Sequence, residues 1–155
     1  MVGRGGTLTA RLLRRLTDCP VVELTPCQAA MGRDGGARYR AVVVENFDAP
    51  GEQTLSPRAD VTVVGLDDGE GRRLAAQSGL PVFAYSDGRP QADLTAKNVC
   101  LRGERLEFEA LTDGDLLRVR VPLGEEPRLY DYLAALAGAL ALGVPLEEAA
   151  RRLAQ

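Results

Sequence analysis

The sequence predicts an α/β fold, a three-layer arrangement of a parallel sheet with flanking helices, extended in the second half by an antiparallel hairpin. Short β-branched apolar runs alternate with a helix-like segment up to Tyr85, as in parallel sheets buried on both faces. From Ala92 onward apolar and polar residues alternate, and Asp113-Gly114 separates two such runs, which is a strong hairpin signal. The chain of 155 residues shows no repeat or linker, so we interpret residues 1–155 as one domain.

Each element follows from a local pattern. Thr9 to Thr17 has leucines on one helical face and arginines on the other, which predicts an amphipathic helix. Continuous apolar runs predict strands at 20–24, 41–44, 61–64 and 81–85, with a helix from Gly71 to Ser78 between the last two. In the second half we expect strands at 92–101, 105–111 and 116–123, then helices at 129–142 and 146–154. The helix at 129–142 is apolar nearly all round, so it packs either on its own sheet or in an oligomeric interface.

Composition excludes several classes of function. A net charge of −3 argues against a nucleic-acid partner, and an arginine-rich chain with Lys97 as its only lysine is typical of a GC-rich bacterial genome. The absence of histidine excludes Ser/His/Asp and Cys/His nucleophiles and imidazole zinc sites. Three cysteines without C-x-x-C spacing favour reduced thiols in a cytoplasmic protein. No apolar signal sequence is visible, and Asp131 and Pro145 interrupt the longest apolar stretch, so we expect no membrane span.

The first residues have the layout of a phosphate-binding loop that lacks its lysine. Such a loop reads G-x-x-x-x-G-K-[ST], and its lysine reaches the β- and γ-phosphates while its hydroxyl binds Mg²⁺. Here Gly6 stands at the lysine position and Thr7 follows it. Gly3, Gly5 and Gly6 predict either a residual anion-binding loop or a tight turn that enters a helix, and Thr7 and Thr9 each fit a metal ligand or a helix cap.

Residues 61–75 read V-T-V-V-G-L-D-D-G-E-G-R-R-L-A, which resembles the V-V-N-A-D-D-x-x-G-R-x-L-A segment of the Mur ligases. Ala96–Val99, the hairpin and residues 129–148 then follow the order of that family's central ATP-binding domain, and the pattern is closest to the UDP-N-acetylmuramyl-tripeptide synthetases. Thr7–Leu13 is similar to the family's helix after its phosphate loop. Mur ligases join a carboxylate to an amino acid through an acyl phosphate and release ADP, mostly in peptidoglycan biosynthesis. The resemblance therefore implies their fold, with ATP and Mg²⁺ as candidate cofactors.

The resemblance also implies a set of site residues. The nucleotide-binding candidates are Gly3, Gly5, Gly6, Thr7, Asp67, Asp68, Arg128 and Asp131, and the metal-binding candidates are Thr7 and Glu45. Instead of a nucleotide or metal role, Asp67 and Asp68 can simply cap the helix that starts near Gly69, and Glu45 can lie in a solvated loop. The cluster of Arg11, Arg14 and Arg15 is interpreted as a solvated helix face.

Departures from the family pattern fall on the catalytic positions. Gly6 replaces the lysine, and Asn46 to Leu66 contain neither the T-N-x-x-x-D-H-L-D segment nor the family's modified lysine. Because phosphoryl transfer depends on positioning and electrostatic stabilisation, we assign no catalytic residue and predict a truncated pseudoenzyme with a degenerate phosphate loop. It would be a scaffold or regulatory protein of cell-wall peptide ligation with a protein partner, or a homo-oligomer. The alternatives are a reduced ATP-dependent, ADP-forming acid–amino-acid ligase domain with separately encoded partners, and a nucleotide-binding module without turnover.

Overall fold

The computed structural model describes residues 8–24, 28, 31–32, 35–44, 58–77, 79–123 and 129–155. The helices are α1 (Leu8–Leu16), α4 (Gly69–Gln77), α5 (Leu129–Ala141) and α6 (Leu146–Leu153). The strands are β1 (Tyr39–Val43), β2 (Ala59–Gly65), β3 (Val82–Asp87), β4 (Leu94–Arg102), β5 (Arg105–Leu111) and β6 (Leu116–Pro122). Among these residues, no helix has the length and apolar character needed to cross a membrane.

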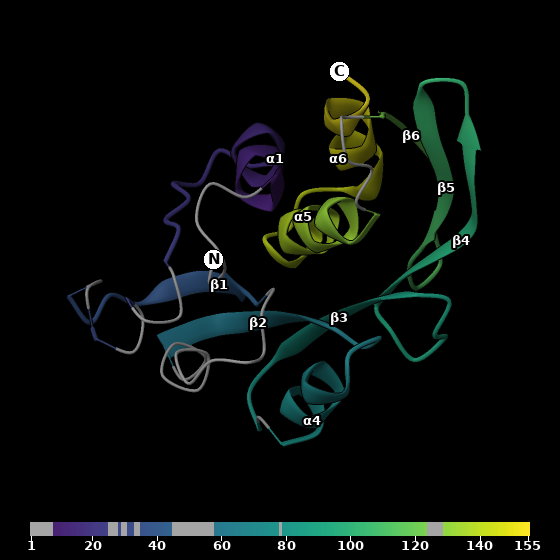
Figure 1. The fold of residues 1–155 in the computed structure, drawn as a ribbon. Helices are drawn as coiled ribbons and strands as arrows, with labels where there is room; N and C mark the ends of the chain where they lie inside the picture. The colour runs from purple at the N-terminus through teal and green to yellow at the C-terminus, as the bar shows by residue number, and fades with distance from the viewer. Residues whose placement is uncertain are drawn as a thin grey trace.

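The strands form one mixed six-stranded sheet in the order β1-β2-β3-β4-β5-β6. Strands β1 to β4 pair in parallel, whereas β4-β5 and β5-β6 pair antiparallel and curl away from the rest of the sheet (Figure 1). The β3-β4 pair is parallel although only residues 88–93 link the strands. Leu94 pairs with Tyr85 and Ala96 with Asp87, so only the last residues of β3 pair with the first residues of β4. The linking segment therefore has to return along β3 by only a few residues, which it does without a crossover helix.

Helices cover both faces of the parallel strands. In Figure 1, α4 lies on one face, while α5, α1 and α6 lie on the other. The larger core contains Leu12, Leu16, Phe108, Leu133 and Leu136, so α1, α5 and the hairpin strands bury their apolar side chains together. Residues Leu133 to Ala137 of α5 are almost fully buried within the chain itself. Of the two expectations for this helix, packing on its own sheet therefore accounts for these residues.

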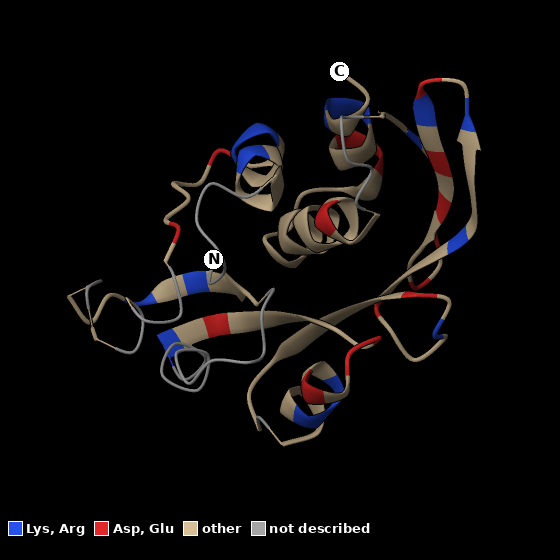
Figure 2. Ribbon diagram, viewed as in Figure 1, with Lys and Arg blue, Asp and Glu red and all other residues tan. Residues whose placement is uncertain are grey.

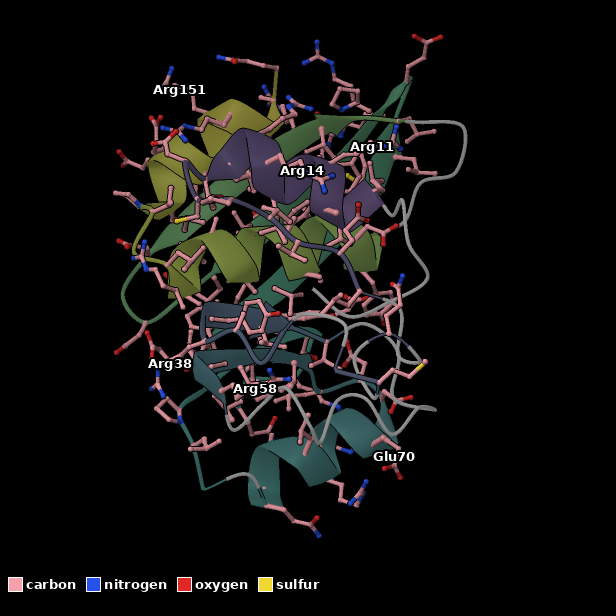
Figure 3. The ribbon with its side chains drawn as sticks, turned by 90° about the vertical axis from the view of Figure 1, so that its left-hand side faces the viewer. Arg11, Arg14, Arg38, Arg58, Glu70 and Arg151 are labelled. Carbon is pink, nitrogen blue, oxygen red and sulfur yellow. The ribbon has the colours of Figure 1, made fainter. Side chains whose placement is uncertain are left out.

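Helix α1 forms as its sequence pattern predicts. Leu12, Leu13 and Leu16 are buried, and Arg11, Arg14 and Arg15 are exposed. Figure 3 shows Arg11 and Arg14 on the outer side of α1, and Arg14 lies 3.1 Å from Glu23. The basic cluster is therefore a solvated helix face, as expected.

Helix α5 passes unusually close to its neighbours at Gly138. A Cβ atom at this position would lie 2.8 Å from Leu13 Cδ2 and 3.1 Å from Val43 Cγ2. Real Cβ atoms essentially never approach that closely, so glycine is needed where α5 crosses α1 and β1. This crossing fixes the position of α5, and with it the start of α5 at the site described below.

The sequence-based elements agree with the structure at most positions, and α4, β5 and α5 differ from their expected bounds by no more than two residues. The strand expected at 20–24 is wrong. Residues 20–23 have no regular structure, and only Leu24 makes an isolated bridge. Arg14 donates to the carbonyl of Val21 at 3.3 Å and pairs with Glu23, so this segment follows the surface of α1 instead of entering the sheet.

Candidate functional site

Asp67 links the carboxyl ends of β2 and β3. Its Oδ1 accepts a hydrogen bond from Ser86 Oγ at 2.6 Å, and its Oδ2 accepts one from the backbone N–H of Asp87 at 2.7 Å. Arg89 Nε lies 3.6 Å from the same carboxylate. Open α/β sheets bind their ligands at this edge, and here one carboxylate holds two adjacent strand ends together.

Asp68 caps helix α4. Its Oδ1 accepts hydrogen bonds from the backbone N–H groups of Glu70 at 2.7 Å and Gly71 at 3.3 Å. These are N–H groups of the first helical turn, which have no partner within the helix. The capping alternative is thereby confirmed for Asp68, and its role in nucleotide binding stays a prediction.

The N-termini of α1 and α5 meet beside this edge. Thr9 Oγ1 in the first turn of α1 donates a hydrogen bond to Asp131 Oδ1 in the first turn of α5, at 3.1 Å. Thr9 is fully buried. A helix N-terminus attracts negative charge, and at the start of α5 the carboxylate of Asp131 provides it.

The phenol of Tyr130, in the first turn of α5, lies close to Asp67 and Asp87 at the strand ends. Burial raises the pKa of its phenol, and the negative charges of Asp67 and Asp87 and a hydrogen bond to Asp67 raise this pKa further. The side chain nevertheless keeps 49% of its surface exposed. Tyr130 therefore joins the start of α5 to the Asp67 cluster at a position that solvent and ligands can reach.

The described arginines near this edge are already engaged. Arg72 donates to the carbonyls of Leu66 at 2.8 Å and Asp67 at 3.2 Å, and Arg73 pairs with Glu70 at 2.6 Å. Arg89 lies against Asp67. Carboxylates and arginines therefore lie together at this edge, with Asp67 and Asp87 close to Tyr130.

The structure brings together only some of the expected site residues. Asp67 lies close to Tyr130, Asp131 follows Tyr130 in α5 and is bonded to Thr9, and Asp68 points its carboxylate at α4. Gly3, Gly5, Gly6, Thr7, Glu45 and Arg128 lie outside the described residues. In the described part of the chain, no group of three or more Cys, Asp or Glu side chains is placed to hold a metal ion.

Sequence reasoning missed the roles of Ser86 and Tyr130 in this cluster, and it predicted a cap or a metal ligand at Thr9 and not the hydrogen bond to Asp131. Ser86-Asp87-Gly88 directly follows an apolar strand, so its position at the carboxyl edge was readable from the pattern. The Thr9–Asp131 contact joins residues 122 positions apart, and no local pattern could have predicted it.

Curated ligases match the sequence of this chain. The chain is 32% identical over 114 residues to the UDP-N-acetylmuramoyl-L-alanyl-D-glutamate--2,6-diaminopimelate ligase of Streptomyces coelicolor, covering 72% of this chain and 22% of that protein. It is 26% identical over 160 residues to the corresponding ligase of Streptomyces avermitilis, covering 92% of this chain and 32% of that protein. The chain is a relative of the Mur ligases. No protein-family model matches it.

Solved structures show the same fold at low sequence identity. The UDP-N-acetylmuramoylalanyl-D-glutamyl-2,6-diaminopimelate--D-alanyl-D-alanyl ligase of Acinetobacter baumannii superposes with a TM-score of 0.74 at 17% identity, covering 99% of this chain and 44% of that one. A pseudomurein peptide ligase type C from Methanothermus fervidus gives a TM-score of 0.67 at 12% identity, covering 98% and 47%. The expected α/β fold of a Mur ligase domain is confirmed.

This Mur ligase relative spans about a fifth to a third of the curated ligases it matches. The likeness extends to ligases with different names, so the closer assignment to the tripeptide synthetases stays a prediction. The correspondence with the family's central domain, and the boundaries of that single domain, also stay predictions.

Proposed function

We propose that this chain is a non-catalytic Mur-ligase-like domain, a scaffold or regulator of cytoplasmic cell-wall peptide ligation that acts through protein contacts. The charge balance at the carboxyl edge carries this proposal. Burial raises the pKa of Tyr130 and the charges of Asp67 and Asp87 raise it further, and Arg89 is paired with Asp67. A triphosphate placed there would meet the carboxylates of Asp67 and Asp87, while Arg72 is bound to backbone carbonyls and Arg73 and Arg89 to carboxylates.

The position of the only lysine supports the same conclusion. Lys97 lies on β4, in register with Glu109 of β5, whereas the resemblance requires a lysine at Gly6 before α1. A charge-assisted hydrogen bond contributes about 1.5–3 kcal/mol, and in phosphoryl transfer such contacts provide most of the catalysis. A domain without this lysine keeps the framework of the site and loses most of its rate.

An assay of ADP release tests this proposal. The chain is incubated with ATP, Mg²⁺, UDP-N-acetylmuramoyl-L-alanyl-D-glutamate and 2,6-diaminopimelate, with the S. coelicolor relative as the positive control. We expect no ADP above the level of the enzyme-free reaction. ADP that appears together with the ligated tripeptide product would refute the proposal.

A reduced ATP-dependent ligase domain is the second candidate, and one observation favours it. The Thr9–Asp131 hydrogen bond keeps two helix N-termini beside the carboxyl edge, where they can still attract phosphate. Gly6→Lys tests this candidate by isothermal calorimetry with ATP and Mg²⁺. If the substitution raises ATP affinity, the loop before α1 lies at the phosphate position. If affinity does not change, the proposed alignment of the loop is wrong.

A further inference from the structure

The outer face of strands β4, β5 and β6 carries more basic than acidic side chains. Strand register defines this face, because residues directly opposite each other in an antiparallel pair share one side of the sheet. Leu106 and Phe108 of β5 are buried in the core, so the alternate residues of β5 and their partners lie on the outer side. The charged members of this basic face are Lys97, Arg102, Arg105, Glu107, Glu109, Arg118 and Arg120.

The arginines of the basic face cover its carboxylates. Glu107 lies 3.2 Å from Arg120 and 3.7 Å from Arg102, and Glu109 lies 3.5 Å from Arg118. The side chains of the two glutamates are only 12% and 23% exposed, whereas those of the three arginines are between 53% and 71% exposed. A partner that approaches this face therefore meets guanidinium groups before it meets carboxylates.

Two further cations add to the positive charge of the basic face. Lys97 and Arg105 are exposed, and neither makes an ion pair within the described part of the chain. The face thus has five cations and two carboxylates, and it keeps a positive excess even when Glu104 of the adjoining turn is counted.

This positive excess is local, because the whole chain has a net charge of −3. In Figure 2, basic and acidic residues lie side by side on these strands, and the described helices cover only their other side. Charge of one sign gathered on an open face favours a partner of the opposite sign.

The spacing of the basic face fits an extended peptide. Arg118 and Arg120 are alternate residues of β6, so their Cα atoms are about 6.6 Å apart. Alternate side chains of an extended peptide have the same spacing, so carboxylates two positions apart can face both arginines. A guanidinium group binds a carboxylate through two parallel hydrogen bonds, which adds geometric specificity to the attraction of charge.

The size of the basic face disfavours a nucleic acid. Its charged residues span about 13 Å along β5, from Arg105 to Glu109, and about 10 Å across the three strands. A single DNA-binding module buries about 600–1,000 Å² of protein surface. A duplex would therefore extend beyond this face onto a chain whose net charge is negative.

We propose that the basic face binds an extended acidic segment of a partner protein, with carboxylates at alternate positions. This inference rests on the proposed function, in which the chain acts through protein contacts, and it gives that contact a surface and a chemistry. The segment lies along β6 with its carboxylates against Arg118 and Arg120, while Lys97 and Arg105 attract it from the neighbouring strands. The contact is small and exposed, so binding is weak and falls as salt rises.

A nuclear magnetic resonance titration with a synthetic peptide tests this inference. The probe is an eight-residue peptide of alternating glutamate and threonine with blocked ends, and the same peptide with glutamine in place of glutamate is its control. We expect amide shifts in β4, β5 and β6 that diminish with added salt, and none with the control peptide. Absent shifts, or shifts confined to other elements, overturn the proposal. An eight-nucleotide oligothymidylate that binds more tightly than the acidic peptide overturns the choice of partner.

A charge-removing variant tests the basic face directly. Lys97→Gln/Arg105→Gln should weaken binding of the acidic peptide about three- to tenfold, the loss expected for two exposed ion pairs. Neither residue has an ion pair to lose in the described part of the chain, and circular dichroism checks that the variant folds.

The matched control for this variant is Arg11→Gln/Arg38→Gln. It removes the same charge from the side of the molecule that Figure 3 shows, away from the hairpin, and should weaken binding less than about twofold. Equal losses in the two double variants overturn the proposal.

Glu107→Gln should change binding in the opposite direction. It removes the carboxylate that Arg102 and Arg120 share, so both guanidinium groups become available to the partner and binding should tighten about two- to fivefold. Weaker binding by the folded variant contradicts the proposal. None of these titrations contains ATP or measures ADP, so their failure is distinguishable from failure of the ADP assay.

Discussion

Thr9 on α1 donates a hydrogen bond to Asp131 on α5 at 3.1 Å, across 122 positions of sequence. The hydroxyl is fully buried, and the acceptor lies in the first turn of α5, where a carboxylate is favoured by the helix dipole. This bond joins the first turns of two helices that also pack together at Gly138.

Thr9→Val should lower the free energy of unfolding by about 1–3 kcal/mol, because it removes a buried donor while nearly preserving shape. Urea unfolding followed by circular dichroism measures the change. Arg11→Ala, at an exposed position of the same helix, should stay within about 0.5 kcal/mol of the wild type. Equal effects of the two substitutions would show that the bond contributes nothing.

Gly138→Ala should destabilise the fold by about 1–3 kcal/mol, because the new methyl group would overlap Leu13 and Val43. The gain of up to about 1 kcal/mol in helix propensity does not offset this overlap. Gly69→Ala at the start of α4 is the control, since its Cβ would meet only Arg72 Nη2, at 3.7 Å. We expect this control to be neutral or slightly stabilising in the same urea titration.

Asp68→Ala should cost about 0.5–2 kcal/mol, the usual loss when an N-cap is removed. Asp68→Ser keeps a capping oxygen and should recover most of that loss. Amide hydrogen exchange in α4 locates the effect, because protection should fall there before it falls in the strands. If Ser and Ala behave alike, the carboxylate does not act as a cap.

The pKa of Tyr130 should lie above its usual value, owing first to burial and then to Asp67 and Asp87. Since this folded-state pKa is raised, the stability linked to the phenol is present below about pH 10 and is lost as the pH rises through the folded pKa. Ultraviolet titration of the wild type against Tyr130→Phe measures the pKa. Asp67→Asn should bring it down toward its usual value, and no movement would show that the charge of Asp67 does not act on Tyr130.

The framework of this protein was readable from local patterns. The Asp113-Gly114 turn predicted the β5-β6 hairpin, and the leucine spacing of α1 predicted which of its faces is buried. The strand predicted at 20–24 was wrong because an apolar run alone does not specify a strand. There, Arg14 binds the Val21 carbonyl and Glu23, a side-chain interaction that periodicity does not reveal.

The candidate site was predictable only in part. Asp67 followed from the resemblance of residues 61–75 to the Mur ligases, and it does lie at the carboxyl ends of parallel strands, where open α/β sheets bind their ligands. The partners of Asp67 are Ser86 and Asp87 of the next strand, and the partner of Asp131 is Thr9 near the start of the chain. Contacts of this kind depend on the assembled sheet and on the Gly138 crossing, so composition and spacing do not determine them.

The most direct test of the account is the thermal unfolding of this chain with increasing ATP in excess Mg²⁺. A domain that has lost its triphosphate contacts should unfold at the same temperature at every ATP concentration, while the S. coelicolor ligase measured alongside should be stabilised. A ligand present at about a hundredfold excess over its Kd stabilises the folded state by about 2.7 kcal/mol. A rise in Tm that corresponds to a stabilisation of this size, and that increases with ATP concentration, would contradict the central claim.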